Sequence, residues 1–227
     1  MMSRNLRAGL AVLAAIFPLL GVFLWGWNVR EVVILYWFEN LIIGLWQLAK
    51  MGLAGIGQKS AGCSLFFLMG FFTVHYGGFC AGHGVFILAL TGGEGASGAP
   101  RALGSMGDWW GPFIFIGLLI SVVRDAWASL PEAALWSVAS MFAMRGLGVW
   151  QDFIQSGEWK NVEGNRLMLE PYQNVIILHV AIIIGGGLVM WRQDAWPLLG
   201  LIVLGKLGLD LRAIFKAPAT TKEGNTR

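Results

Sequence analysis

Long apolar stretches with few charges dominate the pattern of this chain. A helix needs about 20 apolar residues to cross the hydrocarbon core of a bilayer. By this test the sequence predicts six membrane spans, which lie at about 8–27, 32–49, 64–91, 110–123, 173–191 and 195–214. We therefore predict an all-α polytopic transmembrane helix bundle that forms a single domain over 1–216. The polar tail, 217–227, is expected to be disordered.

The segment 131–155 is apolar but mixed, because Arg145, Gln151 and Asp152 interrupt it. Such segments are typical of helices that lie in the membrane interface, so we predict an interfacial or re-entrant helix here. Six spans then place 12 of the 16 Lys and Arg residues on one side of the membrane. The positive-inside rule makes that side cytoplasmic and places both termini there.

Composition agrees with a protein that faces lipid. Hydrophobic residues make up 56% of the 227 positions and charged residues only 13%, about half the usual share for a soluble domain. The expected partner is therefore a lipid bilayer. The net charge is +3, and the basic residues lie in short loops, where they would set the orientation of the chain in the membrane. No nucleic-acid partner is therefore expected. Cys63 and Cys80 do not form a CxxC motif, and on one helix they are too far apart for a disulfide.

Ionisable residues inside a span are costly, so each one suggests a function. The second span places Glu39 and Asn40 on one polar face, and the last span places Lys206 four residues before Asp210. An interhelical hydrogen-bond seam would explain the first pair. A mutual ion pair would explain the second.

All three histidines fall in predicted spans. His75 is followed by Tyr76, and His83 lies eight residues further along a glycine-rich helix. On an ideal helix, eight residues rise about 12 Å, so His75 and His83 could share a metal only if the helix unwinds near its glycines. His179 lies in the fifth span. Close helix packing over small residues is the competing interpretation.

These residues also carry a resemblance. The segments Trp37-Phe38-Glu39-Asn40, His75-Tyr76-Gly77 with His83-Gly84, Leu178-His179, and Lys206 with Asp210-Leu211 are similar to those of a family of uncharacterised bacterial integral membrane proteins, a domain of unknown function. The resemblance covers the whole membrane region. It implies that these residues form one functional unit, but it supplies no activity.

Three hypotheses follow. The first is a buried site built from Glu39, Asn40, His75, Tyr76, His179, Lys206 and Asp210, which binds a transition metal such as zinc, or haem, through His75, His83, His179 and Glu39. The second is a small transporter or channel component that moves protons or a solute along a column of titratable groups, where a homo-oligomer would compensate for the small chain. The third is a structural protein whose polar residues only join its helices. The sequence does not decide whether the chain is an enzyme.

Overall fold

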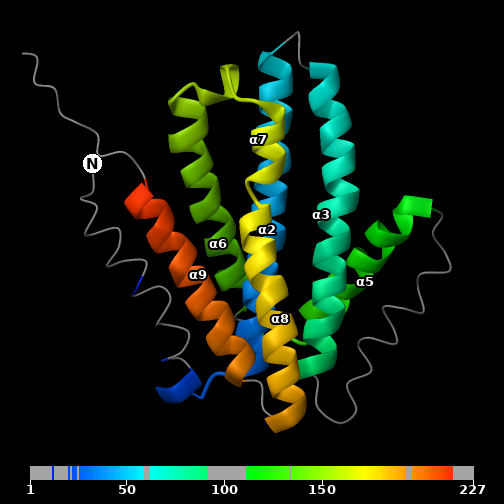
Figure 1. The fold of residues 1–227 in the computed structure, drawn as a ribbon, viewed down its shortest axis with the longest axis vertical. Coiled ribbons are helices and arrows are strands. Elements are labelled where there is room, and N and C mark those ends of the chain that lie inside the picture. Colours follow the sequence, from blue (N-terminus) through cyan, green and yellow to red (C-terminus); the bar gives the residue numbers. More distant parts are fainter. Residues whose placement is uncertain are drawn as a thin grey trace, which may run out of the picture.

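The structure is a computed structural model that describes residues 26–58, 62–91, 111–132, 134–192 and 196–216, together with Val12, Leu20 and 22–24. Every regular element within these residues is helical, so the all-α prediction is confirmed. Figure 1 shows most of the helices side by side in one upright bundle. The first predicted span, 8–27, falls largely outside the described residues, as does the tail. The prediction of a single domain stays a prediction.

Two long helices form the centre of the bundle. Helix α2 spans Val29–Gly57 and helix α3 spans Gly62–Thr91. The Asn28 side chain caps α2 by accepting a hydrogen bond from the backbone N–H of Arg30 at 2.9 Å. Among the described residues, only these two helices are long and apolar enough to cross a membrane. Two of the six predicted spans, 32–49 and 64–91, therefore meet the criterion.

Close contacts at glycines bring α2 and α3 together. The Trp37 indole N–H donates to the Cys80 carbonyl at 2.8 Å, and the same ring lies against Gly84. Gly44 faces the ring of Tyr76 in the same way. Because these glycines lack a Cβ, large aromatic rings can lie directly on the opposite backbone, and Trp37 is only 1% exposed.

Helix α5 differs from the predicted span at 110–123. It spans Ile114–Ala128, after a short 3-10 turn, η2, at Gly111–Phe113. Its 15 residues give a length of about 22 Å, less than the hydrocarbon core of a bilayer. Phe115 lies over Gly78, near the middle of α3, so α5 covers only the second half of that helix.

The segment 131–155, which we predicted to be an interfacial or re-entrant helix, is largely helical, and its orientation in a membrane stays a prediction. Helix α6 spans Ala134–Val149 and continues into a π-helix, η3, at Trp150–Gln155. Figure 1 shows α6 upright beside α2. Trp46 of α2 lies over Gly146, and its indole donates to the Phe142 carbonyl at 3.1 Å. Helix α6 therefore packs along α2 through this aromatic contact.

One helix of the bundle is broken. A 3-10 turn, η4, at Glu158–Lys160 leads to the short helix α7, Gly164–Leu169, and α8 follows at Tyr172–Arg192. In Figure 1, α7 and α8 follow one another down the same side of the bundle. The break falls at Glu170–Pro171, where proline lacks the N–H that a continuous helix needs.

Helices α8 and α9 form the last antiparallel pair. Helix α9 spans Trp196–Lys216 and approaches α8 most closely at Gly185, where an added Cβ would lie 2.8 Å from the Leu198 Cα. The apolar part of each helix is short, Val175–Trp191 in α8 and Trp196–Leu209 in α9. Length and hydropathy alone therefore do not identify either helix as a span, against the six-span prediction.

Candidate functional site

The carboxylate of Glu39 binds two cations from different helices. Arg145 of α6 donates from Nη2 to Oε1 at 2.9 Å, and Lys206 of α9 donates from Nζ to Oε2. Glu39 itself is buried in α2, with 9% of its surface exposed. We call Glu39, Arg145 and Lys206 the charge cluster. Since both carboxylate oxygens are bonded to cations, the cluster ties α2, α6 and α9 together.

The charge cluster lies in largely apolar surroundings. Ile177, Leu178 and Ile202 line a small cavity of about 40 Å³ beside it. The Lys206 ammonium also lies 5.1 Å from the centre of the Tyr36 ring, within the range of a cation–π contact. Two cations share one carboxylate here, so the cluster carries one positive charge in excess.

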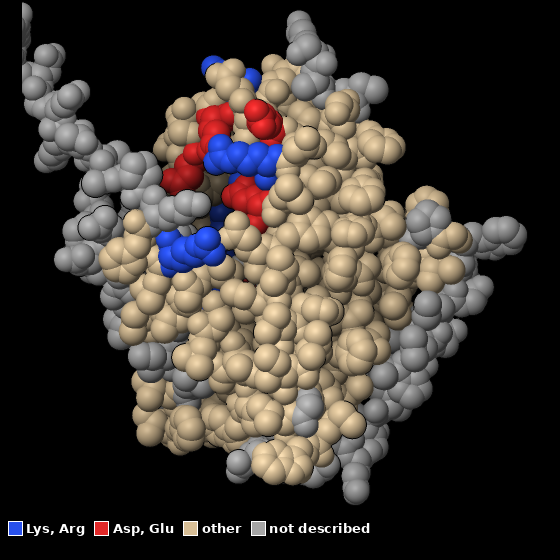
Figure 2. Space-filling view, viewed as in Figure 1, with Lys and Arg blue, Asp and Glu red and all other residues tan. Residues whose placement is uncertain are grey.

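A polar cleft opens on the surface above the cluster. It has a volume of about 350 Å³, and its charged lining residues are Lys50, Arg145, Asp152, Glu158, Arg166 and Glu170. Figure 2 shows charged side chains of both signs around a hollow near one end of the molecule. Ile43 and Arg145 line both this polar cleft and the small cavity. Arg145 is therefore the charged residue that joins the charge cluster to the open cleft.

Salt bridges pair most charges of the cleft wall. Lys50 binds Glu170 at 2.6 Å, and Arg166 binds Glu158 at 3.0 Å. The remaining acid, Asp152, lines the cleft near its exposed rim. The wall therefore carries one net negative charge, from Asp152, whereas the charge cluster at the floor carries one net positive charge.

The helix break at Glu170–Pro171 forms part of the same cleft. The Gln47 amide donates a hydrogen bond to the Leu167 carbonyl, which belongs to the last turn of α7. The same amide nitrogen lies 3.3 Å from the Glu170 carboxylate. Gln47 therefore satisfies a carbonyl that the interrupted helix leaves without a partner. Non-helical backbone of this kind is tolerated at membrane depth where it lines a polar cavity.

A buried tyrosine links the neighbourhood of the cluster to α8. The Tyr76 hydroxyl donates to the Asn40 carbonyl at 2.9 Å, while the Asn40 amide donates to the Tyr36 carbonyl at 3.0 Å. The Tyr76 ring meets the edge of the Tyr172 ring at a centroid distance of 5.9 Å. Polar groups of α2, α3 and α8 thus lie in one layer of the bundle.

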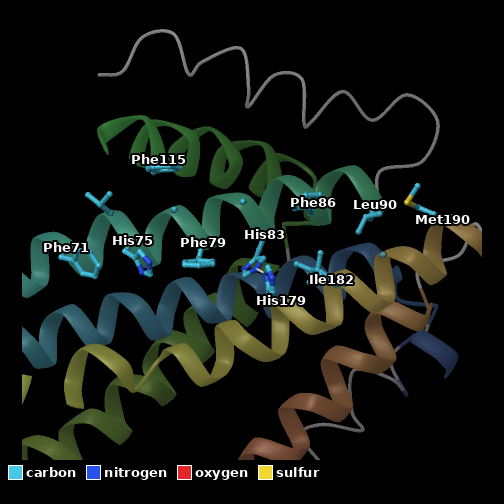
Figure 3. Close-up of a pocket in the computed structure, with 15 residues that line it drawn as sticks. Phe71, His75, Phe79, His83, Phe86, Leu90, Phe115, His179, Ile182 and Met190 are labelled. Carbon is cyan, nitrogen blue, oxygen red and sulfur yellow. Dashed lines mark hydrogen bonds between the residues drawn. The ribbon is translucent and has the colours of Figure 1, made fainter. Parts of the chain in front are cut away.

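The histidines lie on the other side of α3. His75 pairs with Tyr172, and His83 pairs with His179. Nδ1 of His75 lies 2.6 Å from the Tyr172 hydroxyl, and Nε2 of His83 lies 3.0 Å from Nδ1 of His179. Figure 3 shows His83 of α3 and His179 of α8 directly facing each other. Helix α3 is unbroken from Gly62 to Thr91, so the unwinding that would bring His75 and His83 to one metal ion does not occur.

Comparison with known proteins identifies a family. A family model described as a family of unknown function (DUF6498) matches residues 1–225. The chain belongs to this family. No curated protein and no solved structure matches it. The DUF6498 match confirms the resemblance to a family without an assigned function. It is silent on membrane location and on source organism, which stay predictions.

In this DUF6498 member the predicted site residues fall into separate groups. Glu39 and Lys206 meet, and Asn40 meets Tyr76, as one functional unit would require. His75 and His179 lie apart from Glu39, which is bonded to cations instead. The side chain of Asp210 lies outside the described part of the structure, so its ion pair with Lys206 stays a prediction.

The donor set does not fit the predicted zinc or haem site at Glu39. In the described part of the chain, no three His, Cys, Asp or Glu side chains are grouped so that they could hold a metal ion. The Glu39 oxygens bind Arg145 and Lys206, which leaves them poorly placed to bind a metal together with a histidine.

Two important residues are only weakly signalled by the sequence. Arg145 looks like a charge on an interfacial helix, yet it binds Glu39, which lies 106 positions earlier in the chain. Tyr172, which binds His75, was not singled out. Pro171 immediately before it was the available signal, because a proline inside a long helical pattern predicts a break.

Proposed function

We propose that the protein is an integral membrane protein that binds a small anionic solute in the polar cleft, as the binding site of a transporter. The membrane part is supported by α2 and α3 and by large apolar side chains on the outer faces of several helices. Phe67, Trp136 and Ile183 are between 62% and 78% exposed. On the face in Figure 2, charged side chains gather around the hollow, and the surface below it is uncharged. Such a surface suits lipid better than water.

The arrangement of the helices supports a finer proposal. The α6–η3 helix covers residues 134–155, which gives a length of about 33 Å, enough to cross a bilayer. We propose that it crosses beside α2, with α8 and α9 as further spans. Lys50, Lys160 and Arg166 lie toward one end of the bundle, which by the positive-inside rule would be cytoplasmic. The polar cleft would then open to the cytoplasm.

The observation that carries the solute proposal is the charge cluster itself. A buried carboxylate with two cations has one positive charge without a partner among the three residues. An anion bound to Arg145 in the cleft would balance this charge through charge-assisted hydrogen bonds. Arg145 suits this role, because its side chain is 43% exposed and lines the open cleft.

Geometry sets the class of anion. A guanidinium binds planar carboxylates and phosphates through paired hydrogen bonds. A cleft of about 350 Å³ lies at the small end of ligand sites, so the solute should be of metabolite size. A small carboxylate or inorganic phosphate fits both conditions.

The competing hypotheses explain less of this geometry. A purely structural seam needs the Glu39 ion pairs but no open cleft at Arg145. A proton column would need Glu39 to change its charge, and two bound cations resist protonation of the carboxylate. Metal or haem binding stays a hypothesis for the histidines, without Glu39.

Equilibrium binding tests the proposal. Detergent-purified protein is incubated with radiolabelled succinate or inorganic phosphate, and with labelled agmatine as a cationic probe that has no carboxylate. We expect saturable binding of at least one anion and none of agmatine. Arg145→Gln should lose that binding, whereas Arg124→Gln, an exposed charge on α5, should keep it. Equal binding by the two variants would contradict the proposal.

A further inference from the structure

A second hollow lies on the far side of α3 from the charge cluster. It has a volume of about 670 Å³ and is bounded by α3, α5 and α8. We call it the aromatic groove, because Phe71, Phe79, Phe86 and Phe115 line it together with the three histidines. Figure 3 shows Phe71, His75, Phe79, His83 and Phe86 in a row along α3, with Phe115 on α5 and with His179 and Ile182 on α8. The groove shares no lining residue with the polar cleft.

The lining of the groove excludes a charged ligand group. Apart from its histidines, the residues that line it are apolar, and none of them is Lys, Arg, Asp or Glu. An anionic headgroup or a free carboxylate would lose its hydration there without gaining a countercharge. The ligand should therefore be apolar and uncharged.

The histidines nevertheless offer hydrogen bonds. His75 and His179 each use Nδ1 in a hydrogen bond to a neighbour, and neither Nε2 is bonded to another described residue, so both Nε2 atoms are available to a ligand. His83 is only 4% exposed, and its Nδ1 has no partner in the described part of the structure. Because that nitrogen is inaccessible from the groove, His83 contributes by holding the His179 ring in place through the contact at 3.0 Å.

We propose that the aromatic groove binds a membrane quinone, with its ring between the phenylalanines and a carbonyl oxygen bonded to a histidine. A quinone ring is flat, uncharged and apolar on both faces, so it can stack on aromatic side chains. Its carbonyl oxygens accept hydrogen bonds, and an imidazole N–H can donate one. Its isoprenoid tail suits the apolar remainder of the groove. The proposal concerns binding alone.

Entry from the lipid is consistent with the position of the groove. Phe86 and Ile183 line it and are 58% and 62% exposed, so the groove opens on the outer surface of the bundle. This route rests on the proposed membrane location but not on the polar cleft. Anion binding and quinone binding can therefore fail independently.

Gly82 provides a direct test, since it lines the groove and an added Cβ would meet nothing within 4 Å. The variant Gly82→Phe should fill the groove without disturbing α3. Gly70→Phe is the matched control, because Gly70 lies on the same helix, has the same free space and does not line the groove. Native mass spectrometry of the detergent-purified proteins with decylubiquinone measures the bound probe, with decanol as an uncharged competitor.

We expect one decylubiquinone per chain in the wild type and in Gly70→Phe, and at least a tenfold weaker affinity in Gly82→Phe. His179→Leu, at an exposed position, should weaken binding about fivefold through loss of a hydrogen bond or of the His83 contact. This second variant decides the matter if Gly82→Phe fails to fold. Unchanged affinity in the folded variants would overturn the site, and displacement by an equal concentration of decanol would overturn the quinone assignment.

Discussion

The Arg145 guanidinium binds the Glu39 carboxylate at 2.9 Å, although 106 positions separate the two residues in the sequence. Lys206 binds the other oxygen of the same carboxylate from a third helix. One carboxylate and two cationic side chains therefore join α2, α6 and α9. Both the stability of the protein and the charge of its polar cleft depend on this arrangement.

Removal of the acid should destabilise the protein more than removal of one base. Glu39→Gln leaves two cations around a neutral amide, which we expect to cost about 3 kcal/mol of the free energy of unfolding. Lys206→Met still leaves Arg145 to balance Glu39, so its cost should be smaller. The measurement is denaturant unfolding of the detergent-purified variants.

A double variant supplies the control. Glu39→Gln combined with Lys206→Met removes one charge of each sign, and it should be more stable than the sum of the two single effects predicts. Simple additivity of the two changes would mean that the ion pair is energetically unimportant.

The sequence predicted the partners of this cluster unevenly. Glu39 and Lys206 stood out because charged residues in apolar stretches are rare and costly. Arg145 did not, because a segment with Arg145, Gln151 and Asp152 resembles an interfacial helix when its neighbours are unknown. Only the packing of α6 on α2, through Trp46 and Gly146, reveals that Arg145 reaches Glu39.

The position of α6 can be tested in membranes. Glu132→Cys and Ser156→Cys place single cysteines at the two ends of the α6–η3 helix, in a background without Cys63 and Cys80. If this helix crosses the bilayer, an impermeant thiol reagent should label the two positions from opposite sides. Labelling of both positions from the same side would contradict a crossing helix and support the interfacial orientation.

The contact of α8 with α9 should be sensitive to a single methyl group. A Cβ at Gly185 would lie 2.8 Å from the Leu198 Cα, and backbone cannot move aside as a flexible side chain can. Gly185→Ala should therefore lower the free energy of unfolding by about 1–3 kcal/mol, the usual cost of overpacking. The melting temperature should fall with it. Gly200→Ala is the control, because its Cβ meets nothing within 4 Å. Equal melting temperatures for the two variants would contradict the packing described.

The amide of Gln47 should stabilise the helix break. Gln47→Leu leaves the Leu167 carbonyl without its buried donor, at an expected cost of about 1–3 kcal/mol. Gln173→Leu, at an exposed position in α8, should have little effect. Thermal unfolding followed by fluorescence measures the stability of both variants. If Gln47→Leu is as stable as the wild type, the Leu167 carbonyl must find another partner.

The histidines illustrate a second limit of sequence reasoning. Helical spacing correctly indicated that His75 and His83 do not meet on a regular helix. It could not indicate that Tyr172 and His179 of a distant helix would pair with them, since those contacts depend on how α8 packs on α3. The predicted single site around His75 and Glu39 is instead divided between two faces of the bundle.

Currents from a solid-supported membrane test the central claim, anion binding at Arg145, most directly. Proteoliposomes receive a rapid jump in sodium succinate or sodium phosphate, with agmatine chloride as the cationic control. We predict a saturable current for an anion that is absent in Arg145→Gln and present in Arg124→Gln. No anion-dependent current in the wild type, or the same current in Arg145→Gln, would contradict the account.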